Sequence, residues 1–494
     1  MTNLRQIPWL SLLVLLPLVT GVVLLAIPKG KIGLIRWLSL AAALVTFVLS
    51  VGLFIGYDET TAGYQFIEKM DWLPALGISY HLGIDGISAA LELMAGIVVL
   101  AGVLVTWHVS DRAKEYFSFL MFLAASVFGV FASLDLFLLF FFFELAVFPK
   151  YLMIVMWGSP KTREYGGMKL TLYLFLGSVL ALVGVLAVYF QSGLLTFNLL
   201  ELEQAGFGVE FQRLWIAFIF IAFGILPGLI PFHRWPPHGH VAAPTAVSML
   251  LAGVEMKVGA FAALRAGLML LPDGMRFWAP LVIILATINV VYGAFIAMIQ
   301  KDFKYVIGFS SVSHMGLVFI GFATLTPEGL TGAGLQMFSH GIMTALFFSI
   351  VGMVYDRTHT RNLGELGGLY RYMPVAMFGF VIGGLVSMGM PGFSGFIAEM
   401  PIYIGAWKTF PVSAIVSAIS IVVTAAYILL VVRKVFFGEV PEALKPGVSD
   451  ITLRDKIVVI ALSGLMIAIG LVPSILTPTI QAGVNHILAI LGGA

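Results

Sequence analysis

The sequence contains no cysteine and very little charge. Without cysteine, disulfide bonds, thiolate metal sites and cysteine nucleophiles are excluded. Asp, Glu, Lys and Arg make up only 11% of the 494 residues and the formal net charge is +2, so no nucleic-acid partner is expected. By contrast, 60% of the residues are hydrophobic and the mean hydropathy is +1.04. These values predict a polytopic membrane protein.

Apolar runs of about 20 residues are long enough to cross a bilayer as helices. They predict an all-α fold with fourteen membrane spans. Because no small-residue cleavage pattern follows the first run, we expect it to be a span and not a removed signal peptide. Residues 476–494 are too short and too polar for a fifteenth. The expected spans are 8–27, 32–56, 84–107, 114–132, 135–157, 166–190, 213–234, 244–271, 277–299, 303–324, 330–355, 374–408, 412–437 and 456–475.

Basic residues gather in the loops that follow odd-numbered spans, whereas the loops after even-numbered spans are poor in them. By the positive-inside rule, this asymmetry places both termini on the non-cytoplasmic side. The loop cations are Lys29, Lys31, Arg112, Lys114, Lys161, Arg163, Arg234, Lys301, Lys304, Arg357, Arg361, Arg371, Arg433, Lys434 and Lys445.

Proline and glycine interrupt two of the spans, the seventh at residues 226–231 and the twelfth at residues 389–395. The backbone groups freed by such breaks are tolerated at membrane depth only where protein or a water-filled cavity satisfies them. Paired breaks in two halves of a transporter point to its ion pathway. Since these breaks are five spans apart, we expect two five-helix repeats of inverted topology. The expected units are an N-terminal three-helix segment (1–113), a first repeat (114–271), a second repeat (272–437) and a C-terminal span and tail (438–494).

Glu144 lies near the middle of the fifth span, in an aromatic and aliphatic run. A charged side chain at the bilayer centre costs about 3 kcal/mol on insertion scales, so such a group is expected to face protein or water and to be functional. Lys169 on the next span is a candidate partner, since a nearby cation that moves would change the proton affinity of the carboxylate. The alternatives are a structural role for Glu144 and a Lys169 that extends to the lipid headgroups.

Glu255 and Lys257 lie deep in the eighth span. Two residues apart on a helix, their side chains point about 200° away from each other, so each needs a partner of its own. A purely structural role is the alternative for Lys257.

His314, His340 and Glu399 lie on the tenth, eleventh and twelfth spans. Neutral imidazole suits proton transfer near physiological pH, so we expect a relay, although a lone histidine on an apolar face is often a satisfied core residue. We expect no metal site at His233, His238 and His240, because the sequence offers no carboxylate or fourth ligand nearby. No extramembrane domain with a phosphate loop or hydrolase triad is present, so we expect no soluble enzyme chemistry in this chain.

Several longer motifs carry a resemblance to a known family. Together they resemble the antiporter-like subunits of respiratory complex I, most closely the M-type subunit. Its counterparts are subunit 4 of the mitochondrial enzyme and the D-type subunit of the cyanobacterial and chloroplast complexes. The motifs are found at residues 80–88, 143–145, 243–246, 251–253, 311–316, 355–360 and 391–396.

The resemblance implies a fourteen-helix fold with two inverted repeats and a central hydrophilic axis. It implies redox-driven proton translocation within an NADH- or ferredoxin-linked quinone oxidoreductase, without a cofactor in this chain. The partners would be the lipid bilayer and other membrane-arm subunits, including neighbouring antiporter-like ones, in a bacterial plasma membrane or a thylakoid-type membrane. By motif position, a Glu144–Lys169 pair would open and close and thereby shift the proton affinity of Lys257. The proton would then pass His314 and His340 to Glu399.

The sequence departs from the family pattern at three positions within the spans. Leu226 occupies the place of a lysine in the broken seventh helix, while Lys150 and Glu255 stand where the family generally has aliphatic residues. Either Lys257 with Glu255 has taken over the relay, in which case Glu255 belongs to it, or pumping is altered or lost. Two other functions share this fold: a subunit of a multisubunit sodium/proton antiporter, and a non-pumping scaffold paralogue in a specialised complex I.

Overall fold

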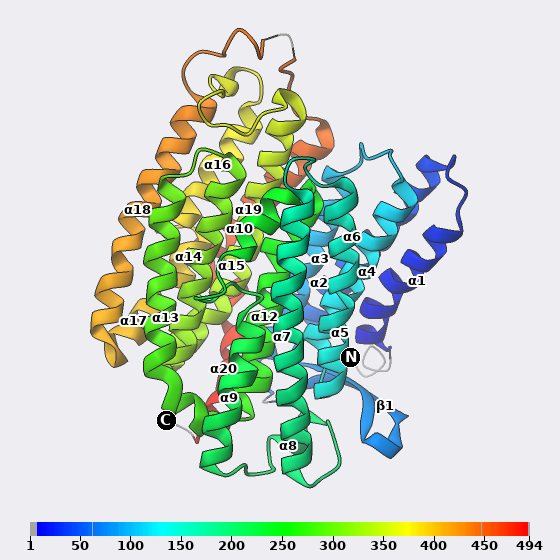
Figure 1. Cartoon of the computed structure of the whole chain (residues 1–494), viewed down its shortest axis with the longest axis vertical. Coiled ribbons are helices and arrows are strands. Elements are labelled where there is room, and N and C mark those ends of the chain that lie inside the picture. The colour runs from blue at the N-terminus through cyan, green and yellow to red at the C-terminus, as the bar shows by residue number, and fades with distance from the viewer. Residues whose placement is uncertain (1–6, 62, 446, 493–494) are drawn as a thin grey trace.

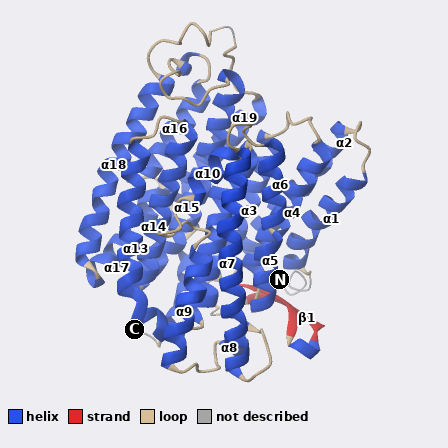
Figure 2. Ribbon diagram, viewed as in Figure 1, coloured by secondary structure: helices blue, strands red, loops and turns tan. Residues whose placement is uncertain are grey.

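The computed structural model describes residues 7–61, 63–445 and 447–492. Long helices run side by side between two ends of the molecule (Figures 1 and 2). Within these ranges, eleven helical segments are long and apolar enough to cross a membrane. The fold is therefore the helical membrane bundle that the hydropathy predicts.

The helices of the first half include two spans made of shorter pieces. The fifth span is made of α5 and α6, and the eighth consists of α11, η3, α12 and η4. The helices are α1 (Trp9–Ala26), α2 (Ile32–Gly56), α3 (Gly86–Val105), α4 (Ala113–Ala132), α5 (Leu136–Leu145), α6 (Val147–Trp157), α7 (Arg163–Ser192), α8 (Leu199–Leu202), α9 (Val209–Gly224), α10 (Trp235–Ala242), α11 (Thr245–Leu250), η3 (Leu251–Glu255), α12 (Met256–Ala262) and η4 (Ala263–Met269).

The second half contains mostly longer, uninterrupted helices and ends in a short helix that packs against α3 and α15. Short 3₁₀ turns lie at Pro74–Leu76, Leu369–Arg371 and Pro473–Ile475. The helices are α13 (Pro272–Met298), α14 (Phe303–Thr324), α15 (Pro327–Thr358), α16 (Pro374–Ser387), α17 (Ser394–Thr409), α18 (Pro411–Phe436), α19 (Leu453–Leu471) and α20 (Thr477–Ile490).

Both predicted breaks are present. The first separates α9 from α10, and the second separates α16 from α17. Each contains glycine with positive φ, Gly228 at 82° in the first and Gly389 at 64° in the second, where a side chain would be strained. The Asn289 amide satisfies part of the first break, because it donates to the Gly228 carbonyl (2.9 Å) and accepts from the Ile230 N–H (2.7 Å). The two divided spans and the last expected span, at α19, are not among the eleven, so the count of fourteen stays a prediction.

The eighth span lies at the centre of the bundle. Like the membrane-spanning parts of α14 and α15, it is buried in the protein, so the polar side chains buried there do not face lipid. Two π-helical segments, η3 and η4, flank the seven-residue helix α12 that carries Lys257. Such wide turns occur frequently at functional sites.

A β-hairpin is the one described element with strands, and the sequence did not predict it. Strands β1 (Gln65–Leu73) and β2 (Ile78–Ile84) pair antiparallel. Glu68 of β1 accepts hydrogen bonds from the backbone N–H groups of Leu10 (2.9 Å) and Ser11 (3.0 Å), which ties the hairpin to the start of α1. The hairpin thus covers one end of an otherwise helical fold.

The two ends of the bundle differ in charge. The described loops that carry the basic residues lie at the upper end in Figure 1, here called the basic end, whereas the hairpin and α8 lie at the lower end, here called the acidic end. Helix α1 begins, and α20 ends, toward the acidic end. The charge asymmetry along the sequence is therefore an asymmetry of the folded molecule.

Candidate functional site

Three of the predicted relay residues meet in the second half of the molecule. His314 of α14 has its Nδ1 atom 3.2 Å from Glu399 Oε1 of α17, and its Nε2 atom 2.9 Å from the Ser387 hydroxyl at the end of α16. The ring centroids of His314 and His340 are 5.4 Å apart. All three predicted residues are at most 5% exposed. An imidazole can accept a proton at one ring nitrogen and give one up at the other, so this group has the geometry of a relay.

Gln336 of α15 belongs to the same group, although the sequence analysis did not select it. Its Nε2 atom lies 3.3 Å from His314 Nδ1 and 3.4 Å from Glu399 Oε1. It stands four residues before His340, one helical turn away, and this spacing is the signal that could have found it. The Gln336 amide therefore helps to hold the His314 imidazole and the Glu399 carboxyl group next to each other.

Lys257 lies fully buried on α12, four residues after Gly253, which packs against Gly341 next to His340. Its ammonium donates to the backbone carbonyl of Ala252 in η3. Lys257 is also close enough to His340 and to the buried His240 to act on both imidazoles electrostatically. The residue is therefore placed to connect the two histidines.

Lys304 is a buried lysine that the sequence analysis treated only as a loop cation. It is the second residue of α14, is 4% exposed, and donates to the Ala243 carbonyl (2.6 Å) and the Ser248 hydroxyl (2.9 Å). The signal that could have found it is Asp302, whose side chain caps the helix at the Lys304 N–H (2.8 Å) and so places Lys304 inside α14.

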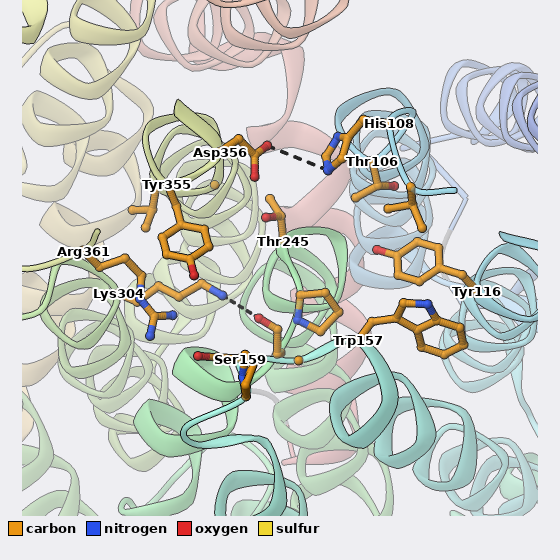
Figure 3. Close-up of a pocket in the computed structure, with 17 residues that line it drawn as sticks. Thr106, His108, Tyr116, Trp157, Ser159, Thr245, Lys304, Tyr355, Asp356 and Arg361 are labelled. Carbon is orange, nitrogen blue, oxygen red and sulfur yellow. Dashed lines mark hydrogen bonds and ion pairs between the residues drawn. The ribbon is translucent and has the colours of Figure 1, made fainter. Parts of the chain in front are cut away.

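A cavity at the basic end leads to Lys304. Its volume is about 250 Å³, and its wall is formed by loop and helix-end residues. Figure 3 shows the Lys304 side chain extending into it, with Tyr355 and Arg361 on one side and Ser159 below. Across the cavity, Asp356 and His108 lie 3.9 Å apart. The cavity gives polar access from the basic end to the buried residues.

The two charges that depart from the family pattern are paired with each other. The ammonium of Lys150, on α6, donates to Glu255 Oε2 on η3, and both side chains are 1% exposed. The prediction that Glu255 and Lys257 have separate partners is therefore correct. The ion pair joins the fifth span to the eighth, next to Lys257.

The direct pairing of Glu144 with Lys169 is wrong. Glu144 accepts a hydrogen bond from the Ser178 hydroxyl of α7. Lys169 donates to the Tyr165 hydroxyl (3.1 Å) and lies 5.2 Å from the centroid of that ring. Ser178 and Lys169 are nine residues apart, which separates them by about 14 Å along α7 and places them on opposite faces. Lys150, and not Lys169, is the lysine that acts electrostatically on Glu144.

A second buried cluster was missed, at the acidic end. Arg265 of η4 binds Asp85 (2.7 Å), the capping residue of α3, and donates to the hydroxyls of Ser88 and Tyr64, both at 3.0 Å. Tyr64 in turn donates to Glu203 (2.8 Å). Burial raises the pKa of Glu203, while the Tyr64 hydrogen bond and Arg265 act in the opposite direction. The motif at residues 80–88 contains Asp85 and Ser88, but Tyr64, Glu203 and Arg265 lie far from it and from one another in the chain, so no local pattern joins them.

The histidines at 233, 238 and 240 lie in different surroundings. His233 packs against Tyr292 with ring centroids 4.8 Å apart, the Nδ1 atom of His238 lies 2.7 Å from the Arg234 carbonyl, and His240 is fully buried. They do not converge on one point.

Comparisons with known proteins bear on the family and the fold of the chain. A family model described as "NADH:quinone oxidoreductase/Mrp antiporter, TM" matches residues 133–428. The chain is 36% identical over 445 residues to "NAD(P)H-quinone oxidoreductase chain 4-2" of Synechocystis sp., covering 88% of this chain and 79% of the relative. It is 37% identical over 494 residues to "NAD(P)H-quinone oxidoreductase chain 4" of Prochlorococcus marinus, covering 97% of this chain and 92% of the relative.

Solved structures share the fold. A chain of respiratory complex I from Thermus thermophilus is 30% identical, with a TM-score of 0.90 and 98% of this chain and 100% of that chain covered. A chain of the Mrp complex from Dietzia sp. has a TM-score of 0.85 over 98% of this chain and 99% of that chain, but is 21% identical and so shows the fold alone. This integral, multi-pass membrane protein therefore belongs to the NADH:quinone oxidoreductase/Mrp antiporter family, as an antiporter-like subunit of the M/4/D type.

Proposed function

We propose that this chain is a proton-translocating subunit of a membrane-bound NAD(P)H- or ferredoxin-linked quinone oxidoreductase, where it works beside other membrane subunits. The names of its relatives and its likeness to a chain of respiratory complex I support the quinone oxidoreductase. The observation that carries the proton function is the contact of His314 with Glu399, because buried acid–base groups within hydrogen-bonding reach serve proton transfer and are expensive to keep otherwise.

The proton route begins at the cavity of the basic end. From Lys304 it continues to His240 and Lys257, and then to the His340–His314–Glu399 group. His240 and His340 are buried imidazoles near Lys257, so each can pass a proton between that lysine and the next group. If the basic end faces the cytoplasm, as the positive-inside rule requires, both termini lie on the opposite side.

Position 226, where the family has a lysine, is a leucine in this chain. The Lys150–Glu255 pair takes the place of that lysine as the charge that switches the proton affinity of Lys257. Lys150 acts on two carboxylates, Glu255 in the core and the half-buried Glu144. A unit charge that moves to or from about 4 Å changes the interaction by about 4 kcal/mol at an effective dielectric constant of 20, or roughly a thousandfold in proton affinity. A shift of Lys150 toward Glu144 therefore changes the field at Lys257 and triggers loading or release there.

The test uses membranes that carry the intact complex. Proton translocation per electron is compared between wild type, His314→Gln and Glu399→Gln, with exposed His359→Gln and Glu365→Gln as matched controls. We expect the first two variants to lose translocation while quinone reduction continues in uncoupled membranes, and the controls to pump normally. An assembled complex that pumps at the wild-type ratio with either relay residue replaced would show that the route is wrong.

A further inference from the structure

Glu92, in the middle of α3, is a buried carboxyl group that the proposed route does not use. Its side chain is 0% exposed, and neither carboxylate oxygen has a hydrogen-bond partner in residues 7–61, 63–445 and 447–492. An ionised carboxylate in such surroundings is an uncompensated charge at membrane depth, which costs several kcal/mol. The neutral carboxylic acid fits this position.

Glu92 shares one face of α3 with two residues of the acidic-end cluster. Asp85, Ser88 and Glu92 follow one another at intervals of three and four residues, which stacks them along one side of the helix. Asp85 and Ser88 contact the Arg265 guanidinium at 2.7 and 3.0 Å. The face that carries Glu92 is therefore turned toward the eighth span.

The register between α3 and the eighth span fixes the height of Glu92. The two elements run antiparallel: Ser88 meets Arg265 near the acidic end, while Val98 lies beside Gly253, 3.4 Å from where a β-carbon would stand, nearer the basic end. Lys257 and Arg265 are about 12 Å apart along the helix axis, and Glu92 stands about 6 Å above Ser88. Glu92 thus stands, in height, between the level of Gly253 and the level of Arg265.

The cluster around Arg265 continues from Glu92 toward the surface of the acidic end. Arg265 and Asp85 have side chains that are 1% exposed, Glu203 is 11% exposed, and His486, whose Nε2 atom lies 3.8 Å from Glu203 Oε2, is 19% exposed. Burial lowers the pKa of His486, and the Arg265 charge lowers it further. Exposure thus increases from Arg265 and Asp85 to Glu203 and His486, so Glu203 and His486 can release a proton to the surface. Like the Glu399–His314 group, they are a carboxyl group beside an imidazole.

We propose that Glu92 binds and releases protons at the head of a second branch, which leads from Lys257 along α3 to Glu203 at the acidic end. In the first step the O–H bond of the neutral Glu92 acid breaks, and its proton leaves through the Ser88 hydroxyl, which passes a proton on to the cluster below. An N–H bond of the Lys257 ammonium then breaks, and an O–H bond forms again on the Glu92 carboxylate. Water that bridges polar groups not in direct contact would carry the proton between these groups.

The branch rests on the proposed function, so both are tested in the same intact complex. Glu92→Gln keeps the shape of the neutral acid but cannot release a proton. Glu92→Asp keeps the carboxyl group. Glu210→Gln, at an exposed position, is the matched control. We expect Glu92→Gln to translocate fewer protons per electron than wild type and Glu92→Asp to retain part of the difference. Infrared difference spectra during turnover should show a carboxylic-acid carbonyl band that Glu92→Gln removes and Glu210→Gln keeps.

Two outcomes overturn the inference. In an assembled complex, a Glu92→Gln variant with the wild-type proton-to-electron ratio shows that Glu92 is not on a proton route. If the variant does not assemble, an infrared spectrum of the wild-type complex without a carboxylic-acid signal during turnover leads to the same conclusion. Glu399→Gln separates the two proposals: if it loses translocation while Glu92→Gln does not, only the branch fails, and if neither changes translocation, the proposed function fails as well.

Discussion

The buried Lys150–Glu255 pair gives a prediction with two separable readouts, stability and pumping. Replacing one member, as in Lys150→Met or Glu255→Gln, leaves the partner charge buried and unpaired, because both side chains are 1% exposed. Breaking a buried pair in this way typically costs about 3–5 kcal/mol. The double variant Lys150→Met/Glu255→Leu removes both charges and replaces them with apolar groups of similar volume, a change that is often neutral or stabilising. We expect the double variant to recover most of the stability lost by either single variant.

The assay is the thermal loss of assembled complex from membranes, followed by proton translocation per electron for every variant that assembles. The exposed pair of Arg213 and Glu210, 2.9 Å apart with side chains 42% and 86% exposed, is the control pair. Exposed pairs contribute about 0.2–1 kcal/mol, so its single and double variants should differ little from wild type.

Either readout can refute the reasoning. A double variant as unstable as the two single variants combined would show that Lys150 and Glu255 do not compensate each other. A double variant that is stable and pumps at the wild-type ratio would show that the pair holds two spans together and is not a switch. A stable double variant that no longer pumps is the result that the proposed switch requires.

The central lysine, the packing of the first break and the orientation in the membrane can each be tested separately. Lys257→Ala should abolish coupled pumping while the complex still assembles, and Leu226→Lys should destabilise assembly by several kcal/mol, because position 226 is 2% exposed and would hold an unpaired charge. Gly259→Ala should destabilise by about 1–3 kcal/mol in a thermal assay, since its β-carbon would stand 2.5 Å from Pro227 Cδ. The chain has no cysteine of its own, and Glu442 and Glu210 are both 86% exposed, so single cysteines can be placed at these two positions. Glu442→Cys should react with an impermeant thiol reagent added on the cytoplasmic side, and Glu210→Cys only with reagent added on the opposite side. The reverse labelling would show that the assigned orientation is inverted.

The elements that the sequence predicted well are those with a local cause. Proline and glycine place the two breaks, because proline lacks a backbone donor and glycine tolerates the positive φ at positions such as Gly228 and Gly389. Long apolar runs likewise located most of the spans. The β-hairpin was missed because its charged residues suggested a loop, and Glu68 finds its hydrogen-bond donors only in α1.

The candidate site divides in the same way. Residue type selected His314, His340 and Glu399, which the fold brings together, but residue type does not say which face of a helix a side chain occupies. Lys169 was assigned to Glu144 from its place on the next span and from its motif position, whereas the carboxylate contacts the opposite face of α7. Lys150 and Glu255 were each recognised as unusual but not as partners, since 105 residues separate them.

The widened turn η3 also decides what stabilises the ammonium of Lys257. Ala252, the acceptor of the Lys257 ammonium, lies five residues earlier, which is the spacing that a π-turn closes with backbone groups. One surplus residue in the helix thus brings a main-chain oxygen to the lysine in place of a side-chain anion. Deletion of a single residue from 251–255 would convert the π-turn to an ordinary α-helical turn and rotate the rest of the eighth span by about 100° about its axis. The Lys257 ammonium would then lose its main-chain acceptor. The length of this segment is therefore as much a requirement of the site as the lysine itself.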